Sequence, residues 1–389
     1  MKLVLLVVVV FVLLGLLEHF RHQRSLRQIP IRIHVNGSRG KSSVTRLIAA
    51  GLRAGGIQTV AKTTGSAARY IHPDGSEHPV YRQGPPNIKE QIAVMRQAAA
   101  EGAKAMVMEC MAIRSDLQTV TERKIVQSTI GVITNVRPDH LEIIGPTIGN
   151  VALALSNTIP TRGQLFCAEQ DFAELFEDVA SRRGSSFHLS DPRNLGDGDL
   201  EGFPYIEHAE NVCLALDVCE VLGVPRETAL SGMRCVTPDV GALRRIILRE
   251  GDQEIEFVNA FAANDPTSTL MVWNRLGLSK QDPEKILVLI NLRGDRMRRS
   301  RDLADVIHEN LRAERYILIG DQTKMFRKWA VRRGASPEAF VDLGRTSAED
   351  VYSALLRMAK PGSCVVGVGN IGGAGQAFLE YLESRRGQG

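Results

Sequence analysis

A short Gly-rich segment, residues 36–43, has the residue types of a phosphate-binding loop. It follows an apolar run that predicts a strand, and a helix is expected to start at Lys41. The backbone N–H groups of such a turn and the helix N-terminus converge on one point, where an anionic phosphate is stabilised. Lys41 can reach the β- and γ-phosphates of ATP, and the Ser42 hydroxyl can hold Mg²⁺. The residues predicted to contact the nucleotide here are Asn36, Gly37, Ser38, Arg39, Gly40, Lys41, Ser42 and Ser43.

The loop is a shortened variant, because Val35 stands where the strict pattern has a glycine. The alternative is a chance Gly-Lys-Ser sequence in a surface turn. The strand expected before it and the helix expected after it favour the phosphate-binding interpretation.

Two other predicted strands end in residues that can bind metal. Glu109 follows the apolar run Met106–Met108, and Asp139 and His140 follow the run Gly131–Asn135. Parallel strands direct their carboxyl ends toward one ligand crevice, so Glu109 is expected to reach a metal held by Ser42. His140 could bind a second ion through its imidazole. The alternative for His140 is a neighbour of a helix cap.

The elements that position these residues follow from the hydrophobic pattern, in which short β-branched runs alternate with helical spacing. This alternation predicts an α/β fold with mostly parallel sheets. The expected strands are 31–36, 57–62, 105–110, 128–134 and 164–168, then 246–249, 255–258, 286–290, 316–319 and 364–368. The expected helices are 41–54, 88–101, 148–159, 172–182 and 209–222, then 267–276, 303–313, 324–332, 348–358 and 376–385.

A Pro/Gly connector at residues 236–241 separates these two series. The 389 residues suffice for two or three domains. We therefore expect a central P-loop-type ATP-binding domain at 31–238 and a C-terminal Rossmann-like α/β domain at 239–389.

The N-terminus carries an apolar run, Leu3–Leu17, that is somewhat short of the roughly 20 residues of a membrane span. No small-residue cleavage site follows, which disfavours a secretory signal; a buried core helix is the other alternative. We expect a single-pass transmembrane anchor at residues 1–20 and a basic stem at 21–30. Arginines after the run place the catalytic part in the cytoplasm. The net charge of +4 is too small to indicate a nucleic-acid partner.

Taken in order, the loop, Met108-Glu109, Thr134-Asn135 and Asp139-His140-Leu141 resemble the ATP-site motifs of the Mur ligase and folylpolyglutamate synthase superfamily. The resemblance implies an ATP-dependent, Mg²⁺-dependent acid–amino acid ligase, with Lys41, Glu109, His140 and Arg244 as catalytic residues. It further implies nucleotide contacts by Asn211 and Asp265. Substrate contacts are implied for Thr64 and Ser66, which lie in a loop after the second strand, and for Arg293 and Arg296.

Arg293 and Arg296 belong to an arginine-rich segment, residues 293–301, that resembles a Gly-Gly-Asp-Arg-Asp turn of the superfamily. This segment could gather a polyanionic chain or help close the protein over ATP. The alternative is a solvated charged loop.

The chain also departs from the superfamily. No nucleotide-sugar domain precedes the loop, and no lysine between Lys124 and Lys280 can serve as the carbamylated lysine of many relatives. The anchor followed directly by this ATP site resembles the ligase subunits of poly-γ-glutamate synthases. That resemblance implies a membrane complex with small partner subunits. Its substrates would be glutamate and the growing polymer, and a glutamyl carboxylate would be activated as an acyl phosphate for attack by the next glutamate amine.

Two other functions stay open. A membrane-anchored motor or regulatory ATPase that serves a partner subunit would also use the loop, but it leaves the second α/β domain without a role. A cytosolic folate-type ligase is disfavoured by the anchor.

Overall fold

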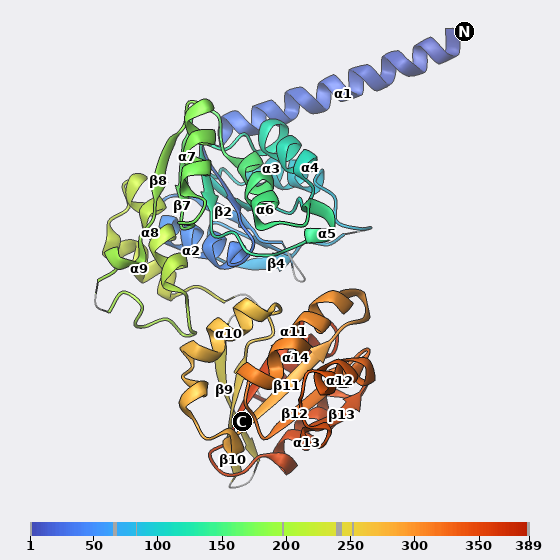
Figure 1. The fold of residues 1–389 in the computed structure, drawn as a ribbon. Coiled ribbons are helices and arrows are strands. Elements are labelled where there is room, and N and C mark those ends of the chain that lie inside the picture. Colours follow the sequence, from blue (N-terminus) through green and yellow to red (C-terminus); the bar gives the residue numbers. More distant parts are fainter. Residues whose placement is uncertain are drawn as a thin grey trace. The chain divides into compact units, whose positions relative to one another are not determined.

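The computed structural model describes residues 2–64, 68–82, 84–196, 198–238, 243–250 and 253–386. The chain separates into two compact units, Met1–Asp239 and Val240–Gly389 (Figure 1). Each unit contains its own sheet and its own hydrophobic core. The α/β architecture with mostly parallel sheets that the sequence predicts is confirmed.

The described part of unit 1 has an eight-stranded sheet in the order β4-β3-β2-β5-β1-β6-β7-β8. Its strands are β1 (Ile31–Asn36), β2 (Thr59–Lys62), β3 (Arg69–Ile71), β4 (Glu77–Pro79), β5 (Ala105–Glu109), β6 (Ile130–Ile133), β7 (Gln164–Cys167) and β8 (Ser186–Leu189). β1 pairs in parallel with β5 and β6, whereas β3 is antiparallel to β2 and β4. The carboxyl ends of β5, β1 and β6 therefore lie side by side at one edge.

Helices cover both faces of this sheet. Successive side chains of a strand point to opposite faces, so alternate residues of β5 pack against different helices. Val107 of β5 packs in a core with the helices α2, α8 and α9, and Met106 and Met108 pack in another with α1 and α3. The α-helices of unit 1 are α1 (Lys2–Gln28), α2 (Lys41–Ala54), α3 (Glu90–Ala100), α4 (Ser115–Val120), α5 (Leu141–Ile144), α6 (Ile148–Leu155), α7 (Ala173–Arg182), α8 (Ala209–Val221) and α9 (Arg226–Arg234).

The N-terminal helix α1 is long and apolar enough to cross a membrane by length and composition. The large apolar side chains from Leu3 to Leu17 are all exposed. The helix does not stop at residue 20: it continues through the predicted basic stem to Gln28. Its last turns are buried against unit 1, where the His22 Nε2 lies 2.8 Å from the Ile125 carbonyl oxygen and Leu26 joins the core. The anchor segment and the folded unit thus share one helix.

The described part of unit 2 has a six-stranded sheet in the order β13-β12-β11-β14-β10-β9, parallel except for β9. Its strands are β9 (Arg244–Glu250), β10 (Gln253–Asn259), β11 (Ile286–Leu292), β12 (Arg315–Gly320), β13 (Phe340–Gly344) and β14 (Cys364–Gly369). Its α-helices are α10 (Pro266–Arg275), α11 (Met297–Asn310), α12 (Thr323–Arg332), α13 (Ala348–Met358) and α14 (Ala374–Arg386).

The sequence-based elements differ from the structure mainly where elements are short or polar. The strands β3, β4, β8 and β13 and the helices α4, α5 and α9 were not predicted. Helix α11 begins at Met297, six residues before the predicted start. The prediction that the arginine-rich segment forms a turn is therefore partly wrong, because Arg298, Arg299 and Arg301 lie on α11.

Candidate functional site

The predicted phosphate-binding loop joins β1 to α2, as the sequence indicates, and its conformation depends on two glycines. Gly37 and Gly40 have φ angles of 137° and 80°, a region that L side chains rarely adopt. A Cβ atom on Gly37 would lie 2.0 Å from the Thr134 Oγ1, and one on Gly40 would lie 2.7 Å from the Asn211 Oδ1. The loop therefore packs directly against the end of β6 and against the start of α8, where Asn211 was predicted to contact nucleotide.

The segment after β6 holds the loop in place. The Arg39 N–H donates to the Asn135 Oδ1 at 3.0 Å, and the Thr134 hydroxyl donates to the Arg39 carbonyl oxygen at 2.6 Å. The Ser38 hydroxyl donates to the Arg137 carbonyl oxygen and accepts from the Arg137 N–H, both at 2.9 Å. These bonds fix the loop from residues about a hundred positions away.

The side chains of the loop take three different environments. The Lys41 Nζ donates to the Gly37 carbonyl oxygen at 2.6 Å and to that of Ser38 at 3.3 Å, so the ammonium group lies over the turn. The Asn36 amide is buried below it and donates to the Gln118 Oε1 at 2.9 Å and to the Thr158 Oγ1 at 3.1 Å. Ser43 is half-buried in the first turn of α2.

Glu109 is the residue on which the site converges. Its buried carboxylate lies at the end of β5, in register with Val35 of β1. The Oε2 atom accepts a hydrogen bond from the Ser42 hydroxyl at 2.8 Å and one from the Thr64 backbone N–H at 2.7 Å. The structure thus brings Ser42, Glu109 and Thr64 to one point. Ser66, the other residue predicted in that loop, lies outside the described residues.

The oxygen atoms at this point suit Mg²⁺ as ligands. Mg²⁺ prefers oxygen and is commonly held by one or two carboxylates together with phosphate oxygens and water. Ser42 Oγ and Glu109 Oε2 supply two oxygens next to the loop. In the described residues, no group of three or more His, Cys, Asp and Glu side chains could hold a metal without such added ligands.

His140 lies near the loop, and the Asp139 carboxylate lies between them. It has a φ of 49° and precedes α5. Its Nε2 lies 3.8 Å from the Asp139 Oδ1, and its Nδ1 lies 3.6 Å from the Glu142 Oε1. Asp139 in turn lies 3.7 Å from the Arg39 guanidinium. The ring therefore sits between two carboxylates, and its role as a metal ligand stays a prediction.

A buried ion pair lies beneath the loop in β1. The His34 Nδ1 lies 2.8 Å from the Glu122 Oε2, and both side chains are buried. Burial alone would lower the pKa of His34, but interactions with Cys110 and Glu122 outweigh it and raise the pKa to about 10. Ser128 completes the pair, because its N–H and hydroxyl donate to the Glu122 Oε1.

Lys62 is a buried polar residue near the site that the sequence interpretation missed. It ends β2, is fully buried, and donates to the Glu90 Oε1 at 2.5 Å. Burial lowers its pKa, although Glu90 opposes the shift. Arg82 binds the other side of the same carboxylate at 2.7 Å. A lysine at the end of an apolar strand is the signal that could have identified it.

Four predicted site residues lie in unit 2. The Asp265 carboxylate caps α10, accepting from the Ser268 N–H at 2.9 Å and from its hydroxyl at 2.6 Å. Arg244 begins β9 and lies 3.6 Å from Glu383. Arg293 binds Asp295 with two hydrogen bonds of 2.9 Å, and Arg296 lies 3.7 Å from the same carboxylate.

Comparisons with known proteins agree with this division of the chain. The family profile "Mur ligase middle domain" matches residues 35–183, and the profile "Poly-gamma-glutamate synthase CapB C-terminal domain" matches residues 247–385. The chain is 37% identical over 388 residues to "PGA synthase CapB" of Bacillus subtilis (strain 168), covering 98% of each chain. It is also 37% identical over 380 residues to "Capsule biosynthesis protein CapB" of Bacillus anthracis, covering 96% of this chain and 81% of that protein.

Among solved structures, "E.coli FolC in complex with DHPP and ADP" has a similar fold. The TM-score is 0.70 at 14% sequence identity, and the match covers 95% of this chain and 92% of that one. At this level of identity the similarity concerns the fold.

Proposed function

We infer the function from one premise: the chain belongs to the CapB family of poly-gamma-glutamate synthase proteins. Membership in this family makes it an ATP-dependent ligase that forms C–N bonds. We propose that the bond is the γ-amide of poly-γ-glutamate, and that the protein adds glutamate to the growing polymer. The observation that carries the proposal is the convergence of Ser42, Glu109 and the Thr64 N–H beside a glycine-dependent phosphate loop.

An amide does not form directly from a carboxylate and an amine near neutral pH, so the carboxylate needs activation. In the proposed reaction a glutamyl carboxylate oxygen attacks the γ-phosphorus of ATP, and ADP leaves. The amine of the next glutamate then attacks the acyl carbon of this acyl phosphate, loses a proton, and displaces phosphate. Such transfers depend on positioning and charge neutralisation more than on a covalent protein group.

The loop residues have the roles that this reaction needs. The N–H groups of the turn and the Lys41 ammonium would bind the β- and γ-phosphates. The Ser42 hydroxyl and the Glu109 carboxylate would hold Mg²⁺, which neutralises charge on the phosphates. The Thr64 N–H, already bonded to Glu109, would keep this carboxylate oriented. The fold and the ADP bound in the FolC structure support the use of ATP.

The remaining site assignments complete the proposal. His140, held between Asp139 and Glu142, would bind or orient a second ion near the acceptor carboxylate. Asn211 would contact the nucleotide next to Gly40. Arg244 would stabilise phosphate charge, and Asp265 would position the nucleotide through α10. The substrate would be contacted by Thr64, Ser66, Arg293 and Arg296.

We also propose that α1 anchors the protein in the cell membrane, with the catalytic units in the cytoplasm and small membrane subunits as partners. The exposed apolar side chains from Leu3 to Leu17 support the anchor. A contiguous exposed apolar surface of this length in water is unfavourable, and lipid or partner helices remove it.

The test is a hydroxamate assay on the full chain in membranes. With ATP, Mg²⁺, glutamate and hydroxylamine, we expect glutamyl hydroxamate to form, because hydroxylamine intercepts an acyl phosphate. Lys41→Ala should abolish the product, whereas Lys104→Ala, which removes an exposed lysine of the same unit, should not. ATP hydrolysis that depends on Lys41 but never yields hydroxamate would favour the regulatory ATPase and overturn the ligase reaction.

A further inference from the structure

Unit 2 concentrates positive charge in one segment of the chain. Residues 293–334 contain twelve Arg and Lys residues against six Asp and Glu residues, a net +6, whereas the whole chain has a net charge of +4. Helix α12 carries much of this excess, since it has no acidic residue. Its basic residues, all exposed, are Lys324, Arg327, Lys328 and Arg332.

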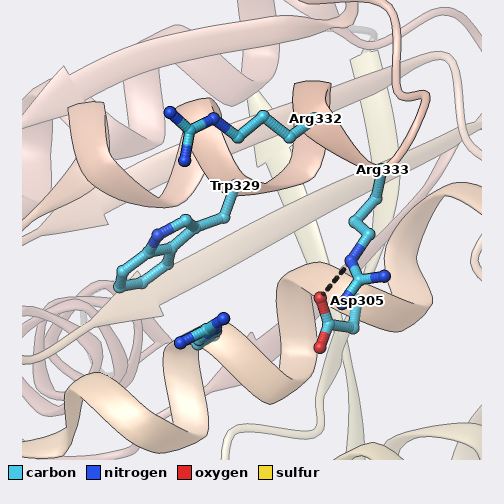
Figure 2. A pocket seen from close by; sticks show the side chains of 5 residues that line it. Asp305, Trp329, Arg332 and Arg333 are labelled. Carbon is cyan, nitrogen blue, oxygen red and sulfur yellow. Dashed lines mark hydrogen bonds and ion pairs between the residues drawn. The ribbon is translucent and has the colours of Figure 1, made fainter.

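A cavity of about 240 Å³ lies beside this helix. It is lined by Arg301 and Asp305 of α11, by Trp329 and Arg332 of α12, and by Arg333. Figure 2 shows the indole of Trp329 and the guanidinium of Arg332 extending from α12, while Arg333 reaches Asp305. That ion pair, at 2.8 Å, neutralises the one carboxylate of the lining.

The cations that remain are available to a ligand. Across the described residues, Arg301, Lys324, Lys328 and Arg332 form no ion pair within 4 Å. Trp329 is half-buried and offers an apolar surface beside Arg301 and Arg332. We call Arg301, Lys324, Lys328, Trp329 and Arg332 the α12 basic face. Arg301 and Arg332 line the cavity together with Trp329. Cations beside an aromatic ring fit an anionic ligand that also has apolar groups.

We propose that the α12 basic face binds the already built part of a γ-linked polyglutamate chain through its carboxylates. This inference rests on the proposed function for the identity of the polymer. The four residues on α12 lie outside the ATP loop and the predicted substrate contacts, and Arg301 ends the arginine-rich segment 293–301. The face would act as a holding site that keeps the product on the enzyme between additions.

The spacing of the cations fits a γ-linked polyglutamate chain. Lys324, Lys328 and Arg332 are four residues apart, so they recur every 6 Å or so along one side of the helix. An α-linked residue spans at most about 3.3–3.6 Å, and the two extra methylene groups of a γ-linked unit lengthen this to about 6 Å. The carboxylates of a γ-linked chain therefore match the repeat of the helix, and its methylenes can pack on Trp329.

Binding is measured without nucleotide on the full chain in neutral detergent, with a fluorescently labelled γ-linked glutamate decamer as the probe. The comparison ligands are an α-linked glutamate decamer and a single-stranded DNA decamer. The chain has two tryptophans, and Trp273 is buried in the core, so a fluorescence change on binding is expected to come from Trp329. Trp329→Phe should remove this change.

The decisive variant is the triple substitution Lys324→Ala, Lys328→Ala and Arg332→Ala, which removes the three cations that lie four residues apart on α12. Loss of three exposed ion pairs is expected to weaken decamer binding about tenfold. The matched control, Lys280→Ala, Lys285→Ala and Arg357→Ala, removes the same charge from exposed positions of the same unit and should change binding less than about twofold. In polymerisation assays the first triple variant should make shorter products at an unchanged rate of hydroxamate formation.

Three results would overturn the holding site: no binding of the γ-linked decamer, equal weakening by the control triple variant, or binding of the α-linked decamer or the DNA at least as tight. The result is separable from the ligase reaction. Hydroxamate formation without decamer binding overturns the face alone, and decamer binding without any hydroxamate overturns the reaction alone.

Discussion

The sheets of the two units differ in the buried polar residues at the carboxyl ends of their strands. In unit 1, the strands β5 and β2 end in the buried charged residues Glu109 and Lys62. In unit 2, buried neutral amides lie at the carboxyl ends of three strands: Asn259 ends β10, Asn291 lies near the end of β11, and Asn370 follows β14.

We interpret this difference as one of role: the charged edge of unit 1 binds ligands, and the neutral edge of unit 2 stabilises the fold. Charges at a buried edge are costly unless ions or opposite charges compensate them, so they are expected where charged ligands bind. The amides of unit 2 satisfy the backbone instead: the Asn291 Nδ2 donates to the Asn370 and Gly372 carbonyl oxygens. The cations that we propose to bind the polymer lie on the exposed surface of α11 and α12. The comparison favours phosphate chemistry in unit 1 and binding of a flexible polyanion on unit 2.

The largest effect is expected at the charged edge. Glu109→Gln keeps the shape of the side chain but removes the charge that would hold Mg²⁺. We expect the rate of hydroxamate formation to fall by about 10²–10³-fold, as for the loss of one electrostatic contact in an active site. The thermal midpoint of unfolding should change little.

The control for this prediction is Glu169→Gln. Glu169 is also a buried carboxylate of unit 1, and it accepts from the Val136 and Asp171 N–H groups. Its substitution should leave activity within a few-fold. Equal losses in the two variants would mean that buried charge in general, rather than Glu109, supports activity.

A smaller effect is expected at the neutral edge. Asn291→Ala leaves the Asn370 and Gly372 carbonyl oxygens without their donor, which should lower the free energy of unfolding of unit 2 by about 2 kcal/mol. Both tryptophans, Trp273 and Trp329, lie in unit 2, so urea unfolding followed by tryptophan fluorescence reports on this unit. Asn274→Ala, at an exposed position, should shift the transition by less than about 0.5 kcal/mol. An Asn291 variant as stable as the wild type would show that this edge is not structural.

The smallest effect is a pH dependence confined to unit 1. Because the pKa of His34 is raised to about 10 in the folded protein and is about 6.5 when unfolded, the folded state binds the extra proton between these values. The stabilisation is complete below pH 6.5 and is lost as the pH rises. Between pH 6.5 and 8 we expect a loss of about 1–2 kcal/mol.

Hydrogen exchange of the β1 amides measures this change, and tryptophan fluorescence of unit 2 serves as the internal reference. His34→Gln should make the stability of β1 nearly independent of pH in this range. If the variant keeps the slope of the wild type, another group of unit 1 titrates.

Much of the site was predictable because its signals are local. The glycines, Lys41 and Ser42 lie within six residues between a strand and a helix, and Glu109 ends an apolar strand. Parallel pairing then brings the strand ends together whatever the length of the connections.

The missed features depend on partners that are distant in sequence. Gln118 and Thr158 hold Asn36 from 82 and 122 residues away, and no local pattern marks them. Lys62 has a local signal, its place at the end of an apolar strand, but its partner Glu90 lies 28 residues away. The start of α11 was missed because its first turns expose arginines and bury only Ser300 before Leu303.

The unbroken course of α1 into unit 1 has a mechanical consequence. Arg32 donates to the carbonyl oxygens of Leu26 and Ile29 and so locks the exit of the helix onto β1. Whatever apolar phase receives Leu3–Leu17, the eleven residues from Glu18 to Gln28 form a rigid helical spacer of roughly 16 Å rather than a flexible tether. The sheet of unit 1 would then keep a fixed distance and orientation relative to that apolar phase. In the proposed function, each glutamate would therefore be added at the same distance from it.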